Sequence, residues 1–150
     1  MRPGLDALLD GAAALGVPVW LASGGFDFYI AALLGARMAA FARRYHNRMR
    51  FAGDRLTPEF PHARFACDRY AVCKGLVCDE GHRHFDRIVF AGDGTSDRCV
   101  IGRADVLCAV RGSLLATEAG ERGAAYRPFD RLDEILPILP PPPLPDERAG

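Results

Sequence analysis

The chain has 150 residues, of which 49% are hydrophobic and 25% are charged, and its formal net charge is zero. A chain of this length and composition can bury one core and fits an ordinary single domain. Zero net charge gives no support to nucleic acid or an anionic membrane as a partner. The apolar run over residues 11–22 contains Pro18 and is too short to span a bilayer. We therefore expect no nucleic-acid partner and no membrane association.

The first half of the chain alternates helical and strand patterns. Apolar residues recur at helical spacing over residues 5–15, and Gly16 follows as a stop signal. The next patterns predict a buried strand over 17–22, a helix over 28–38, a strand over 41–45 and a hairpin around 52–54.

The second half continues the alternation. Its patterns predict a helix over 74–84, a strand over 88–91, a strand over 105–110, a helix over 114–122 and an amphipathic turn over 129–139. Such an order predicts an α/β layered domain with a parallel sheet over residues 1–139. The proline run that starts at Pro140 cannot continue a helix, so residues 140–150 are expected to form a mobile tail.

The segment over residues 87–97 reads as a buried strand that ends in a turn with two carboxylates. Residues 88–91 are all apolar, and Gly92-Asp93-Gly94 then breaks the run. Asp93 and Asp97 would lie at the carboxyl end of the strand, where α/β folds bind their ligands. Carboxylates there are well placed to hold Mg²⁺. Because Asp-Gly is also a common turn dipeptide, a solvated loop is the alternative interpretation.

Two further features suit a phosphate ligand. The predicted strand over 17–22 ends in Ser23-Gly24-Gly25, where a hydroxyl and free backbone N–H groups form a ready phosphate cradle. Lys74 lies between this cradle and the carboxylate turn in the sequence. A lone lysine is normally a solvated surface residue, but this position makes it a candidate for the same site.

In this order, these features resemble a known family. A serine turn, a lysine and then Gly92-Asp-Gly-x-Ser-Asp97 are similar to the second, third and fourth motifs of the haloacid dehalogenase-like phosphatases, within their phosphoserine-phosphatase-like branch. The resemblance covers the chain to about residue 139. A closer likeness, to a phosphatase of methionine salvage in that branch, rests on residues 22–30, 47–51, 60–62, 73–74 and 126–129.

The resemblance implies a three-layer Rossmann-like core, and it also exposes what is absent. In the family, the first and central strand ends in an Asp-x-Asp motif, which supplies the nucleophile and the general acid/base, and a small helical cap follows it. No Asp-x-Asp occurs among the 150 residues. We therefore expect an N-terminally truncated chain that lacks this strand and the cap. The two remaining halves of the sheet would then face an empty slot, and their unpaired edges would favour self-association.

The function implied is a Mg²⁺-dependent phosphomonoester hydrolase that acts on a small phosphorylated metabolite in the cytoplasm. The site residues implied are Asp93, helped by Asp97, for the metal, and Ser23, Gly24, Gly25 and Lys74 for the phosphate. Without the nucleophile the chain alone is expected to be inactive. The alternative is a non-catalytic phosphate-binding or regulatory module, or a remnant. Because the cap that contacts the leaving group is absent, the sequence does not specify the substrate.

The cysteines form an odd set spread through apolar and mixed contexts, which suits free thiols in a reducing compartment. They are Cys67, Cys73, Cys78, Cys99 and Cys108. Cys67, Cys73 and Cys78 with His82 and His84 suggest zinc, but they lack the close cysteine pairs of zinc ribbons. Free thiols are therefore the prediction.

For the residues after the serine turn we predict structural roles. Asp27 is expected to cap the following helix. Phe26, Phe28 and Tyr29 are expected to pack in the core, with contact to a substrate as the alternative.

Overall fold

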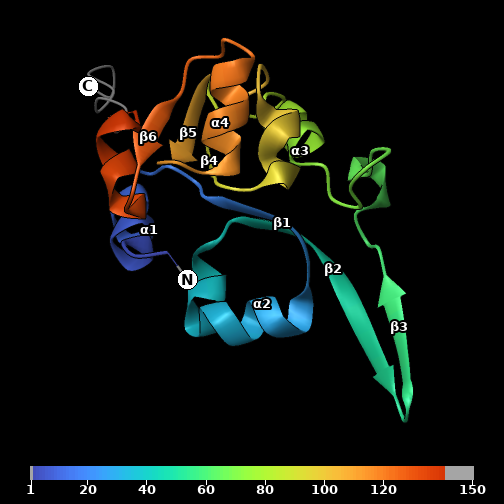
Figure 1. Ribbon diagram of the computed structural model, residues 1–150. Coiled ribbons are helices and arrows are strands. Elements are labelled where there is room, and N and C mark those ends of the chain that lie inside the picture. The colour runs from blue at the N-terminus through green and yellow to red at the C-terminus, as the bar shows by residue number, and fades with distance from the viewer. Residues whose placement is uncertain (1, 141–150) are drawn as a thin grey trace.

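The computed structural model describes residues 2–140 of the chain. Their strands form two three-stranded sheets, with the orders β1-β2-β3 and β4-β5-β6 (Figure 1). The strands are β1 (Trp20–Phe26), β2 (Arg43–Ala52), β3 (Arg55–Glu59), β4 (Val89–Gly92), β5 (Val106–Val110) and β6 (Arg127–Phe129). The predicted tail lies outside the described residues, apart from Pro140.

Helices alternate with these strands, which confirms the predicted α/β class. The α-helices are α1 (Leu5–Ala14), α2 (Asp27–Leu34), α3 (Lys74–Gly81) and α4 (Leu114–Glu121). The shorter 3₁₀ helices are η1 (Gly35–Ala40), η2 (Ala63–Phe65), η3 (Thr95–Val100) and η4 (Leu132–Ile138). No helix within residues 2–140 is long and apolar enough to cross a membrane.

Most strand pairs are parallel, as the sequence pattern predicts. β1 is parallel to β2, and β5 is parallel to both β4 and β6. The predicted hairpin is also present, because β2 and β3 are antiparallel and Ala52 pairs with Arg55. The register leaves Gly53 and Asp54 as the connecting loop, and Gly53 adopts a positive φ of 55°.

Several element boundaries differ from the predictions. β1 begins at Trp20 rather than at residue 17, and Pro18, just before it, has no N–H to donate to a strand ladder. The helix predicted over 28–38 is divided into α2 and η1. The strand β6 was not predicted at all, because three residues that include Pro128 carry no alternating pattern.

The helix α1 packs against strands of both sheets. Leu8 belongs to a buried cluster that includes Val89 and Ala91 of β4. Leu9, on the next position of the helix, belongs to a cluster with Leu21 of β1. One face of β1 and the corresponding face of β4 are therefore covered by the same helix.

The helix α3 also packs against strands of both sheets, on the face opposite to α1. Val77 clusters with Trp20 and Ala22 of β1, and Cys78 clusters with Phe90 of β4. These strand residues alternate with those that α1 contacts, as expected for the two faces of a strand. Shared helices on both faces place β1 and β4 in one layer between two helical layers, in agreement with the predicted three-layer architecture.

The strands β1 and β4 nevertheless do not pair with each other. Within residues 2–140, β1 pairs only with β2 and β4 only with β5, so each leaves one open edge. The effect shows in burial: β5, flanked on both sides, is buried from Leu107 to Val110, whereas the apolar β4 is only half-buried. The predicted strand over 88–91 is therefore present as β4, but it is half-buried rather than buried, because one of its edges has no strand partner within the described residues.

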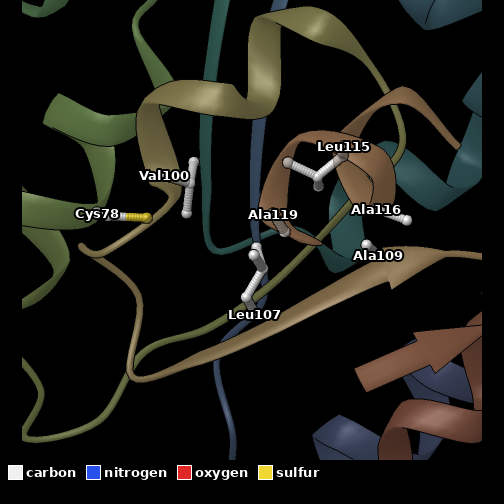
Figure 2. Close-up of a cluster of buried hydrophobic side chains, with 7 residues drawn as sticks. All are labelled: Cys78, Val100, Leu107, Ala109, Leu115, Ala116 and Ala119. Atoms are coloured by element: carbon white, nitrogen blue, oxygen red, sulfur yellow. The ribbon is translucent and has the colours of Figure 1, made fainter. Parts of the chain in front are cut away.

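The largest buried cluster lies between β5 and the helices α3, η3 and α4 (Figure 2). Its side chains are mostly small, which lets the helices approach the sheet closely. They are Cys78, Val100, Leu107, Ala109, Leu115, Ala116 and Ala119. This packing fixes α3 and η3, which carry the polar residues described next.

Candidate active site

Asp97 is the buried centre of the polar cluster at the carboxyl end of β4. The residue is only 1% exposed. Its Oδ2 accepts hydrogen bonds from the backbone N–H groups of Asp93 (2.8 Å) and Gly94 (2.9 Å). Its Oδ1 forms an ion pair with the ammonium of Lys74. One carboxylate thus joins the turn after β4 to the first residue of α3.

Two glycines make this close approach possible. A Cβ at Gly92 would lie 2.4 Å from Asp97 Oδ2, and one at Gly75 would lie 2.3 Å from the carbonyl oxygen of Cys99. Real Cβ atoms do not approach other heavy atoms so closely, so a side chain at either position would push η3 away from β4 or α3. Gly92, which the sequence marks as a turn residue, and Gly75 therefore both serve the packing of the site.

Lys74 occupies the first position of α3 and is mostly buried, with a side chain 15% exposed. A cation at a helix N-terminus is electrostatically unfavourable, because that end of the helix carries partial positive charge. The carboxylate of Asp97 compensates this charge, and Ser96 Oγ accepts a second hydrogen bond from Lys74 at 3.2 Å. Lys74 is therefore not the solvated surface residue that a lone lysine usually is.

Asp93 lies beside this cluster but points to solvent. Its side chain is 60% exposed, and Oδ2 forms an ion pair with the guanidinium of Arg2 at 3.3 Å. An exposed pair of this kind contributes about 0–1 kcal/mol, so it can be displaced at little cost. Arg2 was not identified from the sequence, since nothing in the pattern relates the chain start to residue 93.

Ser23 lies in an irregular part of β1 rather than in a turn after the strand. Ala22 pairs with Tyr45 and Phe26 pairs with Asn47, so the three residues between them face a single residue of β2. The ladder cannot absorb these extra residues, and Ser23-Gly24-Gly25 therefore forms a bulge. The predicted strand end at residue 22 is wrong, although the interruption of the ladder begins there.

The bulge is held by its own polar groups and by β2. The N–H of Gly25 donates to Ser23 Oγ at 3.1 Å, so it is not the free phosphate donor that the sequence interpretation assumed. Asn47 is buried in β2 and donates to the carbonyl oxygen of Gly24 at 2.8 Å. In the sequence, Asn47 contributed only to the family resemblance. Its hydrogen bond to the bulge was not predicted.

Direct contacts connect only some of the predicted site residues. Lys74, Asp97 and the turn at Asp93 are connected by the contacts above, but no hydrogen bond or ion pair within residues 2–140 links Ser23 to Lys74 or Asp93. The carboxyl end of β1 is placed near α3 by packing, because Ala22 and Val77 share a cluster.

The residues after the bulge differ from their predicted roles. Asp27 is the first residue of α2 rather than its cap, and its Oδ1 accepts from the N–H groups of Phe28 (2.9 Å) and Met49 (3.0 Å). Phe28 and Tyr29 are 50% and 40% exposed, so the prediction that they pack in the core is wrong. Phe28 contacts the exposed ring of Phe51 on β2 instead.

The fold is that of known phosphatases. The chain superposes on a substrate-bound complex of phosphoserine phosphatase with a TM-score of 0.66 at 20% identity, covering 93% of this chain and 64% of that one. Phosphoserine phosphatase in its apo form gives a TM-score of 0.65 at 19% identity. No model of a known protein family matches the chain.

Two relatives carry the same name, 2-hydroxy-3-keto-5-methylthiopentenyl-1-phosphate phosphatase. The protein of Exiguobacterium sibiricum is 30% identical over 141 residues, which is 93% of this chain and 63% of the relative. In sequence and in fold, the chain is thus similar to phosphatases of the haloacid dehalogenase-like superfamily. The protein of Brevibacillus brevis is 29% identical over 146 residues, with the same shares covered.

These similarities agree with the family resemblance and the fold that the sequence predicts. The chain spans about 63% of the length of the curated relatives it matches. The gap in strand pairing between β1 and β4 is where the family resemblance puts the first, central strand.

Proposed function

We propose that this chain supplies the phosphate- and metal-binding part of a Mg²⁺-dependent phosphomonoesterase that acts on a small phosphorylated metabolite. The ester named in the relatives, an acyclic keto phosphate, is one example of this substrate class. The observation that carries the proposal is the buried ion pair of Lys74 and Asp97, set at the carboxyl end of β4. In open α/β sheets this edge is where ligands bind.

Within this proposal, Lys74 provides the positive charge for the phosphate. Its ammonium already has two acceptors, Ser96 and Asp97, which fix its direction. A cation held in place before the ligand arrives needs no reorganisation when negative charge develops on the transferring oxygens. Ser23 Oγ and the Gly24 N–H of the bulge are proposed to bind the same oxygens from β1.

Asp93 and Asp97 are proposed to have different parts in metal binding. Asp93 has an exposed carboxylate whose Oδ1 is free of protein donors within residues 2–140, so it fits a hard cation such as Mg²⁺. Both oxygens of Asp97 are taken by Lys74 and by backbone N–H groups, so its proposed part is to hold the Asp93 turn. Bound Mg²⁺ would neutralise phosphate charge and polarise the phosphoryl group.

The second candidate function is a phosphate-binding or regulatory module without catalysis. One observation favours it: the 150 residues contain no Asp-x-Asp motif, and so no nucleophile of the family type. Both functions use the same phosphate site. They are distinguished by phosphate release when these residues are joined to a segment that carries the motif, since only the enzyme gains turnover.

The metal assignment is tested by Asp93→Asn in the chain joined to an Asp-x-Asp segment of the superfamily. We expect turnover to fall on the order of 100-fold or more and the Mg²⁺ concentration for half-maximal rate to rise, because the amide has no negative charge. The matched control is Asp130→Asn, since Asp130 is 61% exposed and also pairs with an arginine. An unchanged Mg²⁺ dependence in Asp93→Asn would contradict the assignment.

A further inference from the structure

Three cysteines that are far apart in the sequence meet beside the candidate active site. The sulfur atoms of Cys67, Cys73 and Cys99 all lie within 4.8 Å of one another. They come from the loop after η2, from the residue that precedes α3 and from η3. Cys73 is buried, and the other two are partly exposed, so the cluster can be reached from solvent.

The spacing of the sulfurs suits one tetrahedral metal ion. Three atoms no more than 4.8 Å apart can be contacted by one ion at about 2.8 Å or less, and a Zn–S bond is about 2.3 Å. An inward shift of about half an ångström per sulfur completes the bonds. Side-chain rotation on partly exposed residues can supply such a shift.

The local backbone stabilises a thiolate at Cys67. The backbone N–H of Arg69, first, together with the neighbouring Cys73 and Cys99 thiols and the N–H of Tyr70, lowers the pKa of the Cys67 thiol. A reciprocal pair of hydrogen bonds between the backbone groups of Cys67 and Tyr70 closes this turn. Backbone N–H groups that donate to sulfur are the outer-shell support that metal-bound thiolates use.

The other thiols of the chain lack these features. Cys78 is buried in the apolar cluster between β5 and the helices α3, η3 and α4. Cys108 is fully buried in a separate apolar cluster with Val110 and Phe129. These two behave as small apolar core residues, whereas the three clustered thiols face one another.

We propose that Cys67, Cys73 and Cys99 form a Zn²⁺ site, with solvent as the fourth ligand. Thiolates are soft ligands that select zinc over the hard Mg²⁺ proposed for the carboxylate turn. On binding, each thiol that is still protonated loses its proton to solvent, and no redox partner is needed. The sequence pattern pointed to Cys67, Cys73 and Cys78 with two histidines as a weak zinc signal, and it missed Cys99 because this residue follows the other two ligands at long range.

The bound ion would position the phosphate site without touching its ligand. Cys73 directly precedes Lys74, and Cys99 follows Asp97 in the same short helix η3. A metal that joins Cys73 to Cys99 therefore fixes the two segments whose side chains form the buried ion pair. The zinc site stands on the thiol geometry alone, so it is independent of whether the carboxylate site hydrolyses phosphate.

The test uses the reduced, metal-free 150-residue chain with Co²⁺ as a spectroscopic probe and Zn²⁺ as competitor. We expect a sulfur-to-cobalt charge-transfer band that saturates at a single ion per chain and is removed by Zn²⁺. Cys67→Ser, Cys73→Ser and Cys99→Ser should each weaken zinc binding on the order of 100-fold or more, since loss of outer-shell partners alone costs 10–100-fold. Cys108→Ala is the control, because it removes a thiol outside the cluster.

A second measurement does not depend on whether the variants fold. Saturating Zn²⁺ should protect Cys67, Cys73 and Cys99 of the wild-type chain from alkylation, as read by mass spectrometry of peptides. Absence of the cobalt band, or unchanged alkylation of the three thiols with Zn²⁺ present, overturns the proposal.

Discussion

The purified 150-residue chain is expected to release no phosphate from small phosphomonoesters above the background rate, with or without Mg²⁺. The proposed site has a cation, amide donors and carboxylates that are suited to grip a phosphate, but its residues include no Asp-x-Asp motif. Without the attacking carboxylate, electrostatic stabilisation has no covalent step to accelerate. The measurement is phosphate release by the chain alone, at several Mg²⁺ concentrations.

Addition of a peptide that carries an Asp-x-Asp strand should restore Mg²⁺-dependent turnover and reduce self-association. The physical reason is that the open edges of β1 and β4 would both gain a strand partner. The matched control is the same peptide with both aspartates changed to asparagine, which should restore solubility without turnover. Robust turnover by the chain alone, abolished by a substitution within it, would show that another residue here is the nucleophile.

Replacement of Asp97 by asparagine should lower the free energy of unfolding by about 3 kcal/mol, because it leaves the mostly buried charge of Lys74 unpaired. Asparagine keeps the shape and one acceptor for the backbone N–H groups, so the loss reports the ion pair. Urea unfolding at one fixed chain concentration, followed by the fluorescence of Trp20, measures the change.

Two further variants show whether the loss comes from the pair. Asp93→Asn should change the free energy of unfolding by no more than about 0.5 kcal/mol, because its own ion pair is exposed. The double variant Lys74→Met with Asp97→Asn should be more stable than Asp97→Asn alone, since the unpaired charge is gone. If Asp97→Asn and Asp93→Asn are equally stable, the buried pair does not have the role assigned here.

The parts of the fold that follow from local pattern were predictable. Periodic apolar residues predict α1, and the turn Gly53-Asp54 between alternating residues predicts the hairpin. The carboxylate turn after β4 was also found, because Gly92 and Gly94 break a continuous apolar run. In each case the signal lies within a few neighbouring residues, where periodicity and turn chemistry act.

The features that were missed depend on contacts between distant segments. The ion pair of Lys74 and Asp97 requires that α3 pack on η3, and no sequence period encodes that contact. The bulge at Ser23 depends on the register between β1 and β2, which a single strand does not reveal. Phe28 looked like a core residue by type, but its environment is set by the position of α2 on the sheet.

The arrangement of α1 and α3 bears on how this chain folds and unfolds. No ladder of backbone hydrogen bonds crosses from β1 to β4 within residues 2–140, so side chains of these two helices transmit stability between the half-sheets. Cooperativity, which a continuous sheet supplies through its backbone, rests here on interlocking methyl groups and rings. Each half-sheet is thus a potential folding unit of its own, and the two helices are the coupling between them.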